Sequence, residues 1–223
     1  MSALDETLEV VSLRTQAMRR IRAGIVYGDI AAGTIHSAPA LAARMGVSVT
    51  PVREALLELT YRGMVTQVRN RGFRIVEQAP ADLDAALELR LFVELPMLAR
   101  LATSFDPADA PQLRSLVTDG IDAARDADFT AFLDLDRRFH LGLLALAGNP
   151  RVVDVVDQVL DQLRLGAFHE PGAGAPLVKV AVGHREILDA IEAGEPAAVE
   201  RAVRAHLTLT RSAWRRRVEP STS

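Results

Sequence analysis

The sequence has no cysteine, few aromatic residues and no long apolar run. With no cysteine among its 223 residues, disulfide bonds and thiolate metal sites are excluded. No apolar stretch approaches the roughly 20 residues of a membrane-spanning helix, and the N-terminus has no apolar run of the signal-peptide type. We therefore expect a cytoplasmic protein with no membrane partner. The 49% of hydrophobic and 25% of charged residues are ordinary for a soluble globular protein.

The net charge of −3 is unevenly distributed along the chain. Residues 1–78 carry ten arginines against seven acidic residues, whereas residues 79–223 carry sixteen Lys or Arg residues against twenty-two acidic ones. A chain of this length can form two small domains with cores of their own. The charge division favours two domains with these bounds and with different partners.

The segment after residue 80 is rich in Ala, Leu and Val, and its apolar residues recur at helical spacing. The sequences FDP, GNP, EPGAGAP and GEP interrupt this pattern with helix-stopping residues and with prolines suited to a first helical turn. The predicted helices cover residues 80–104, 109–126, 128–148, 150–168, 177–193 and 195–217. Six antiparallel helices with short connections predict an all-α six-helix bundle.

The first 78 residues follow a different pattern. A long helix ending near Gly28 is followed by a short helix, a turn at Gly46 and another helix, capped by Ser48 or Thr50, with Pro51 in its first turn. Two alternating stretches, MVTQV and FRIVE, flank RNRG and predict a β-hairpin. This order predicts a winged helix-turn-helix, so the whole chain is predicted to be mainly α.

In a helix-turn-helix the second helix lies in the major groove, with its N-terminal residues at the base edges. Arginine can bond guanine bidentately, and arginines of the hairpin would meet phosphates or the minor groove. The side chains placed for DNA contact are Ser48, Thr50, Arg53, Arg69, Arg71 and Arg74. Any short helical hairpin with a glycine turn has the same spacing, however, so the spacing alone leaves DNA binding open.

The stretch GVSVTPVREALLELTYRGMV, followed by RNRGFRIVE, resembles the DNA-binding domain of the GntR family of bacterial transcription regulators. The resemblance covers residues 11–78 and implies a DNA-binding regulator whose wing includes Gly72 among the residues at the DNA. Two positions depart from the family pattern. Val49 stands where the family usually has a base-reading arginine, and Ala38 stands where an acidic residue is often found. The family pattern therefore does not specify the operator sequence.

The helix predicted over residues 128–148 directs an acid and a histidine into its own apolar stripe. Asp136 and His140 are four residues apart in this stripe, and His184 and His206 lie among apolar residues on two later helices. Buried carboxylates and imidazoles are costly unless they are paired, hydrogen-bonded or bound to a metal. A shared site for Zn, Ni, Mn or Fe is one interpretation. Three unrelated core histidines, each with its own hydrogen bond, are the other.

The C-terminal two-thirds of the chain is similar to the FCD ligand-sensing domain that accompanies GntR DNA-binding domains of the FadR type. The similar stretches are ELRLFVELPMLARLA, FLDLDRRFHLGLLALAGNP, GHREILDAIEAGEP and AVRAHL. The resemblance implies that an aspartate and three histidines bind a divalent metal inside the helical bundle. These ligands fall on Asp136, His140, His184 and His206.

A small carboxylate effector would complete the coordination of such a metal. Arg90 is the candidate to pair with its carboxylate through the planar guanidinium fork. A surface salt bridge between Arg90 and Glu94, four residues on, is an equally good interpretation. Asn149 is placed to line the effector pocket, although a helix-terminating turn explains this residue as well. His36 and His169, in polar segments, are expected in solvent.

These features predict a metabolite-responsive transcription regulator, which we expect to be a repressor. A homodimer would bind double-stranded operator DNA, and its two-fold symmetry would match a pseudo-palindromic operator. Two alternatives use the same four ligands: a metal-dependent hydrolase, in which the metal activates water, and a regulator that senses the metal itself. No residue near the ligands is an obvious general base, and an enzyme has no need of a winged helix, so we expect no catalysis.

Overall fold

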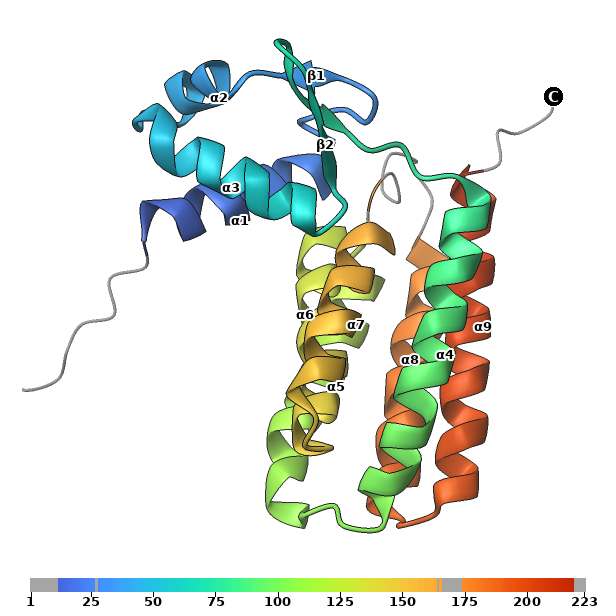
Figure 1. Cartoon of the computed structure of the whole chain (residues 1–223). Coiled ribbons are helices and arrows are strands. Elements are labelled where there is room, and N and C mark those ends of the chain that lie inside the picture. Colours follow the sequence, from blue (N-terminus) through green and yellow to red (C-terminus); the bar gives the residue numbers. More distant parts are fainter. Residues whose placement is uncertain (1–11, 27, 164, 166–173, 219–223) are drawn as a thin grey trace, which may run out of the picture. The chain divides into compact units, whose positions relative to one another are not determined.

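The computed structural model describes residues 12–26, 28–163, 165 and 174–218. The chain divides into two compact units, Met1–Glu77 and Gln78–Ser223. Figure 1 shows the helices and strands of both. Within the described residues, no helix is both long enough and apolar enough to cross a membrane. The fold is mainly α, as the sequence predicts. His169, which was expected in solvent, lies outside the described residues.

The described part of the N-terminal unit contains three helices and a small antiparallel sheet. In chain order the elements are α1 (Leu13–Val26), β1 (Ile35–His36), α2 (Ala38–Met45), α3 (Val49–Tyr61), β2 (Val65–Val68) and β3 (Gly72–Ile75). Ser37 caps α2 by accepting a hydrogen bond from the backbone N–H of Ala40. Gly46 ends α2 at a φ of 67°, a left-handed conformation that glycine adopts without steric cost. The chain can therefore turn directly into α3, which packs against α1 and α2.

The sheet has one strand more than the predicted hairpin. β3 lies between β2 and β1, with Ile35 opposite Arg74 and His36 opposite Phe73. A strand of two residues is too short to show an alternating pattern, so the sequence could not indicate it. Gly72 makes this pairing possible, since a Cβ at this position would collide with the backbone carbonyl oxygen of His36. His36 is half-buried in this strand, and its Nε2 is hydrogen-bonded to Thr34 Oγ1 at 2.8 Å.

The described part of the second unit contains the six predicted helices. They are α4 (Pro80–Ala102), α5 (Ala110–Arg125), α6 (Phe129–Leu146), α7 (Pro150–Leu163), α8 (Gly174–Glu192) and α9 (Pro196–Val218). A single 3-10 turn, η1 (Pro107–Asp109), precedes α5. α7 ends at Leu163, before the predicted residue 168, and residues 164 and 166–168 lie outside the described part of the chain.

The six helices of this unit run alongside one another (Figure 1), and their packing contacts close a ring. α4 packs against α9, α9 against α8, α8 against α5, α5 against α6, α6 against α7, and α7 against α4. The interior is filled by large apolar side chains such as Phe132, Phe139 and Leu143. Among the described residues, the buried polar side chains all belong to this unit: Arg90, Glu94, His140, Asp161, His184, His206 and Thr210. Because buried polar groups are costly, these residues locate the candidate site.

Candidate metal centre and DNA-binding surface

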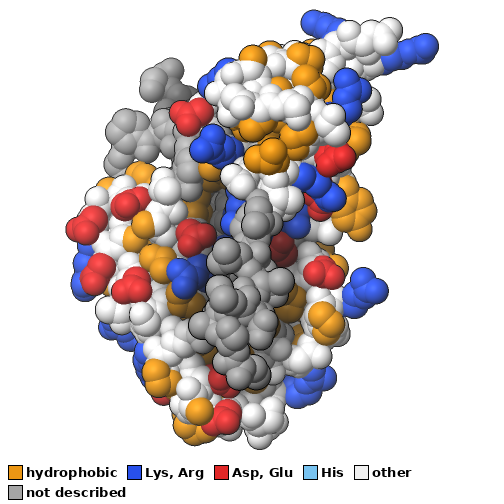
Figure 2. All heavy atoms as spheres, turned by 90° about the vertical axis from the view of Figure 1, so that its left-hand side faces the viewer, with side chains coloured by type: hydrophobic (Ala, Val, Ile, Leu, Met, Phe, Trp, Pro, Cys, Tyr) orange, Lys and Arg blue, Asp and Glu red, His pale blue; other side chains and the backbone are white. Residues whose placement is uncertain are grey.

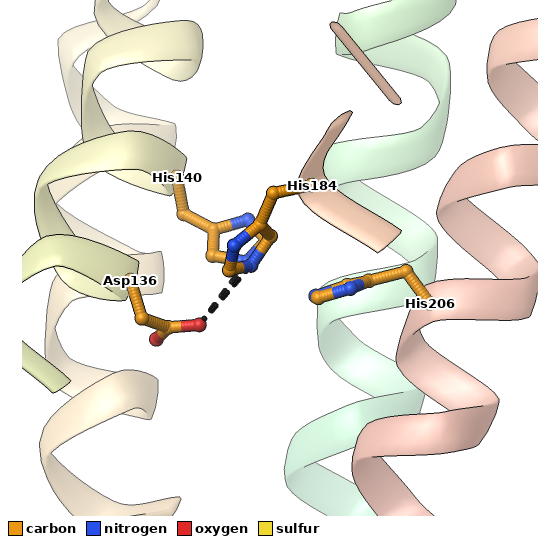
Figure 3. A group of neighbouring side chains, drawn as sticks. All are labelled: Asp136, His140, His184 and His206. Atoms are coloured by element: carbon orange, nitrogen blue, oxygen red, sulfur yellow. Dashed lines mark ion pairs between the residues drawn. The ribbon is translucent and has the colours of Figure 1, made fainter. Parts of the chain in front are cut away.

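The four predicted metal ligands come together inside the helical unit. Asp136 and His140 extend from α6, His184 from α8 and His206 from α9, and their side chains point toward one another (Figure 3). One potential ligand atom from each residue lies within 4.8 Å of the others. Asp136 Oδ1 is 3.3 Å from His184 Nε2 and 3.7 Å from His140 Nε2. The arrangement is consistent with a metal site.

The histidines of this cluster lack the hydrogen bonds that ordinary core histidines would have. Each of the three histidine residues is at most 2% exposed. Among the described residues, both nitrogens of His206 and Nε2 of His184 have no hydrogen-bond partner. The rings instead crowd together, with centroids 4.5 Å apart for His184 and His206 and 5.0 Å apart for His140 and His184. Unpartnered buried nitrogens are costly, and coordination of a shared cation would remove that cost.

The electrostatics of the cluster keep two of its imidazoles neutral. Burial lowers the pKa of His184, and the nearby carboxylate of Asp136 only partly opposes this effect. Burial also lowers the pKa of His206 well below 6.5, and repulsion from His184 and His140 lowers it further. A neutral imidazole has a free lone pair, which is the form that binds metal. At neutral pH both residues are therefore competent ligands.

A buried ion pair on α4 lies next to the histidines. Arg90 is 1% exposed and Glu94 is fully buried. Nε of Arg90 donates to Glu94 Oε1, and Nη2 donates to Oε2 at 3.2 Å. Glu94 Oε2 is also 3.2 Å from His140 Nδ1. Burial alone would raise the pKa of Glu94, but the positive charge of Arg90 and the interaction with His140 lower it to about 2.

The sequence offered two roles for Arg90, and the structure shows the pair with Glu94. The pair is buried, however, whereas a surface pair was expected. Sequence reasoning did not identify Glu94 as part of the site, although its i,i+4 spacing from Arg90 was the available signal. Contact between Arg90 and an effector stays a prediction.

Asn149 lies at the N-terminal end of α7, away from the cluster. Its Oδ1 accepts a hydrogen bond from the backbone N–H of Arg151 at 3.1 Å, as a helix-capping side chain does. At a rise of 1.5 Å per residue, α6 continues for about 9 Å beyond His140 before it ends at Leu146. The structure therefore shows a capping role for Asn149 and does not bring it to the four ligands.

In the N-terminal unit a hollow of about 430 Å³ lies between α3, the start of α2 and the β2–β3 hairpin, which forms the wing. Arg53 of α3 and Arg71 and Gly72 of the wing all line it. Residues 1–78 contain no lysine, and Figure 2 shows arginine side chains projecting from the surface of this unit. The other side chains predicted to contact DNA are all exposed: Ser48, Thr50, Arg69 and Arg74.

This surface has the form that DNA recognition requires. α3 begins at Val49, with Ser48 in the N-cap position, so the predicted base-reading residues occupy its first turns. Positively charged groups of the wing lie beside the helix that would enter the groove. A winged helix-turn-helix joined to a helical unit with a buried cluster of candidate metal ligands is the architecture of a DNA-binding transcription regulator.

Comparison with known families agrees with this class. Residues 13–75 match the model of the bacterial regulatory proteins of the gntR family, and residues 85–209 match that of the FCD domain. The chain therefore belongs to the GntR family of transcription regulators, in the FadR-type subfamily that carries a C-terminal FCD domain. This is a family of regulators and not of enzymes, so the alternative of a metal-dependent hydrolase is wrong.

Several relatives share most of the chain. An HTH-type transcriptional regulator from an unstable DNA locus of Streptomyces ambofaciens is 38% identical over 192 residues, which are 84% of this chain and 79% of that protein. A "Probable D-xylose utilization operon transcriptional repressor" of Paenarthrobacter nicotinovorans is 28% identical over 93% of this chain and 91% of its own length. The solved structure of Escherichia coli McbR/YncC, at 21% identity, has the same fold, with a TM-score of 0.84 over 94% of this chain and all of that one.

Proposed function

We propose that this regulator binds its operator as a homodimer, and that a small carboxylate bound at a divalent metal in the helical unit changes its affinity for DNA. The observation that carries the proposal is the cluster of Asp136, His140, His184 and His206. These residues place three nearly inaccessible imidazoles and a carboxylate within 4.8 Å of one another, and neither nitrogen of His206 has a hydrogen-bond partner among the described residues.

The four residues would hold the ion as nitrogen and oxygen ligands. This donor set suits Zn, Ni, Mn or Fe and does not select among them. An ion that takes more than four ligands would keep a position for the oxygen of a carboxylate. When bound, the ion would therefore supply an anion-binding centre, and no reaction is required of it.

The charge of Arg90 supports an anionic effector at this centre. Its positive charge reaches the cluster, where it contributes to the lowered pKa values of His184 and His206. Two of its nitrogens bind Glu94, and Nη1 takes part in neither of these bonds. We propose that an effector carboxylate approaches this side of the site. A contribution from Asn149 requires the pocket to extend as far as the α6–α7 turn.

Exposed apolar side chains on α4 support the homodimer. Leu89 and Phe92, three residues apart on this helix, are 39% and 71% exposed. Large exposed apolar side chains that gather on one face often mark an interface. A two-fold dimer would present two α3 helices to the two halves of a pseudo-palindrome. The relative from Paenarthrobacter carries the name of a repressor, and we infer repression here too.

Metal content and effector response test the proposal. The protein would be purified without chelator or affinity tag, its metal measured by elemental analysis, and its operator selected from random DNA duplexes. We expect about one ion per chain, and carboxylates that raise the melting temperature of the metal-loaded protein while changing its operator affinity. Asp136→Ala should lose the metal, whereas Asp134→Ala, at an exposed position on the same helix, is the matched control.

Two results would contradict the proposal. Less than about a tenth of an ion per chain, unchanged after addition of Zn, Ni or Mn, would remove the metal. A DNA affinity that follows the metal alone, with no response to any carboxylate, would identify a direct metal sensor.

A further inference from the structure

Glu94 lies beside the metal cluster but is not one of its four ligands. We propose that Glu94 is a positioning residue, which keeps the proton of His140 on Nδ1 and directs Nε2 of the same ring to the metal. Arg90 holds the carboxylate of Glu94 in place. This inference rests on the proposed function, since it concerns how the same site is held. It is carried by the juxtaposition of three buried side chains from α4 and α6.

The two nitrogens of His140 face different partners. Nδ1 is 3.2 Å from Glu94 Oε2, whereas Nε2 is 3.7 Å from Asp136 Oδ1, the oxygen that also faces His184. A neutral imidazole has one N–H and one lone pair. A carboxylate can accept a hydrogen bond but cannot donate one, so Glu94 favours the tautomer with the proton on Nδ1. The lone pair of Nε2 is then available to the cation, as in the carboxylate–histidine–metal arrangement of many metal sites.

The contact between Glu94 and His140 has the length of a hydrogen bond but not its alignment. The N–H direction at Nδ1 does not meet the carboxylate oxygen well enough to form the bond. The torsion that rotates a histidine ring has a broad energy minimum, so a modest rotation can align the two groups. Coordination at Nε2 fixes the ring at its other end. We therefore expect the Nδ1–H···Oε2 bond to form when the cation binds.

Arg90 fixes the position of the Glu94 carboxylate in this interior. Arg90 holds both oxygens of Glu94 through Nε and Nη2. The two residues are one helical turn apart on α4, so the carboxylate is held by its own helix and presented to α6.

A purely structural role for the ion pair makes a different prediction. If the pair serves only to balance charge inside α4, replacing both members together leaves the metal affinity unchanged, and the proton of His140 stays on the same ring nitrogen. Replacing one member alone leaves a buried charge without a partner and can unfold the protein. The test therefore uses Glu94→Gln together with the double variant R90M/E94Q, in which no unpaired charge remains.

The test compares zinc-loaded proteins, because zinc is diamagnetic and permits NMR of the histidine rings. In the wild type we expect a slowly exchanging, low-field Nδ1–H signal of His140 and ¹⁵N shifts that assign the metal to Nε2. In Glu94→Gln and R90M/E94Q this signal should move or disappear. Zinc affinity, measured by competition with a chromophoric chelator, should fall by about tenfold or more, as it does for other metal sites that lose such a partner.

The double variant R114M/E192Q is the matched control. Arg114 of α5 pairs with Glu192 of α8 at 2.8 Å, so this variant makes the same change in charge and also removes a tie within the ring of helices. It should leave both zinc affinity and the His140 signal as in the wild type. A wild type that binds no zinc would contradict the proposed function itself. A wild type that binds zinc, with R90M/E94Q equal to it in affinity and His140 signal, would overturn only the role of Glu94.

Discussion

Gly183→Ala should weaken metal binding although it changes none of the four ligands. Gly183 precedes His184 on α8, and the ring of His206 lies directly against it. A Cβ at residue 183 would lie 2.9 Å from His206 Nδ1 and 3.5 Å from Cβ and Cγ of His206. The nitrogen is thus about 0.5 Å too close for van der Waals contact. The ring must shift by about this amount, which exceeds the tolerance of about 0.2 Å in a metal–ligand distance.

The substitution has different effects on the metal-free and the metal-bound protein. Without metal the ring of His206 can turn away from the new methyl group, and alanine stabilises a helix by about 0.5–1 kcal/mol relative to glycine. With metal bound the ring cannot turn away, so the overpacking makes the free energy of metal binding less favourable by about 1–3 kcal/mol. At 1.4 kcal/mol for each factor of ten, metal affinity should fall by about 5- to 150-fold.

Gly142→Ala is the matched control, because Gly142 lies on the ligand-bearing helix α6, two residues beyond His140. A Cβ there would lie 3.6 Å from Leu113 Cδ2, an ordinary contact. This variant should gain stability in urea unfolding and keep its metal affinity. Chelator competition for zinc and urea unfolding in EDTA would be measured for both variants. The reasoning is refuted if Gly183→Ala binds zinc as tightly as the wild type and gains the same stability as Gly142→Ala.

Three further predictions concern DNA, assembly and pH. Arg53→Ala should reduce the free energy of binding to the selected operator by about 1–3 kcal/mol. Arg71→Ala should weaken binding to all DNA sequences and reduce the slope of log affinity against log salt concentration by about one. Both are measured by fluorescence anisotropy at several salt concentrations, and wild-type binding by both variants would contradict the prediction. Phe92→Asp, on the exposed face of α4, should give a monomer by light scattering at micromolar concentration. If this variant remains a dimer like the wild type, the dimer interface does not include this face. His206 has a lowered pKa in the folded state, so below about pH 6.5 the unfolded chain takes up a proton that the folded chain does not. In EDTA the free energy of unfolding should therefore fall between pH 7.5 and 5.5, by at most about 1.4 kcal/mol from this residue. A fall of the same size in His206→Ala as in the wild type would show that another group is responsible.

The sequence alone determined which face of each helix carries the candidate ligands. The helical repeat of 3.6 residues places Asp136 and His140 on one stripe and directs His184 and His206 toward apolar neighbours. The turn glycine, Gly46, and the alternating wing strands predicted the winged helix in the same way. These are local properties, because each depends on residues only a few positions apart in the chain.

Tertiary structure decided which helices meet and which side of α4 faces inward. Apolar residues surround much of α4, so its pattern does not show whether Arg90 or Phe92 is buried. Closure of the helical ring buries Arg90 and Glu94 and leaves Phe92 71% exposed. The two-residue strand β1 likewise exists only because β3 lies beside it. The sequence could therefore predict the four candidate ligands, but Glu94 comes next to them only through the packing of α4 against α6, which no local pattern encodes.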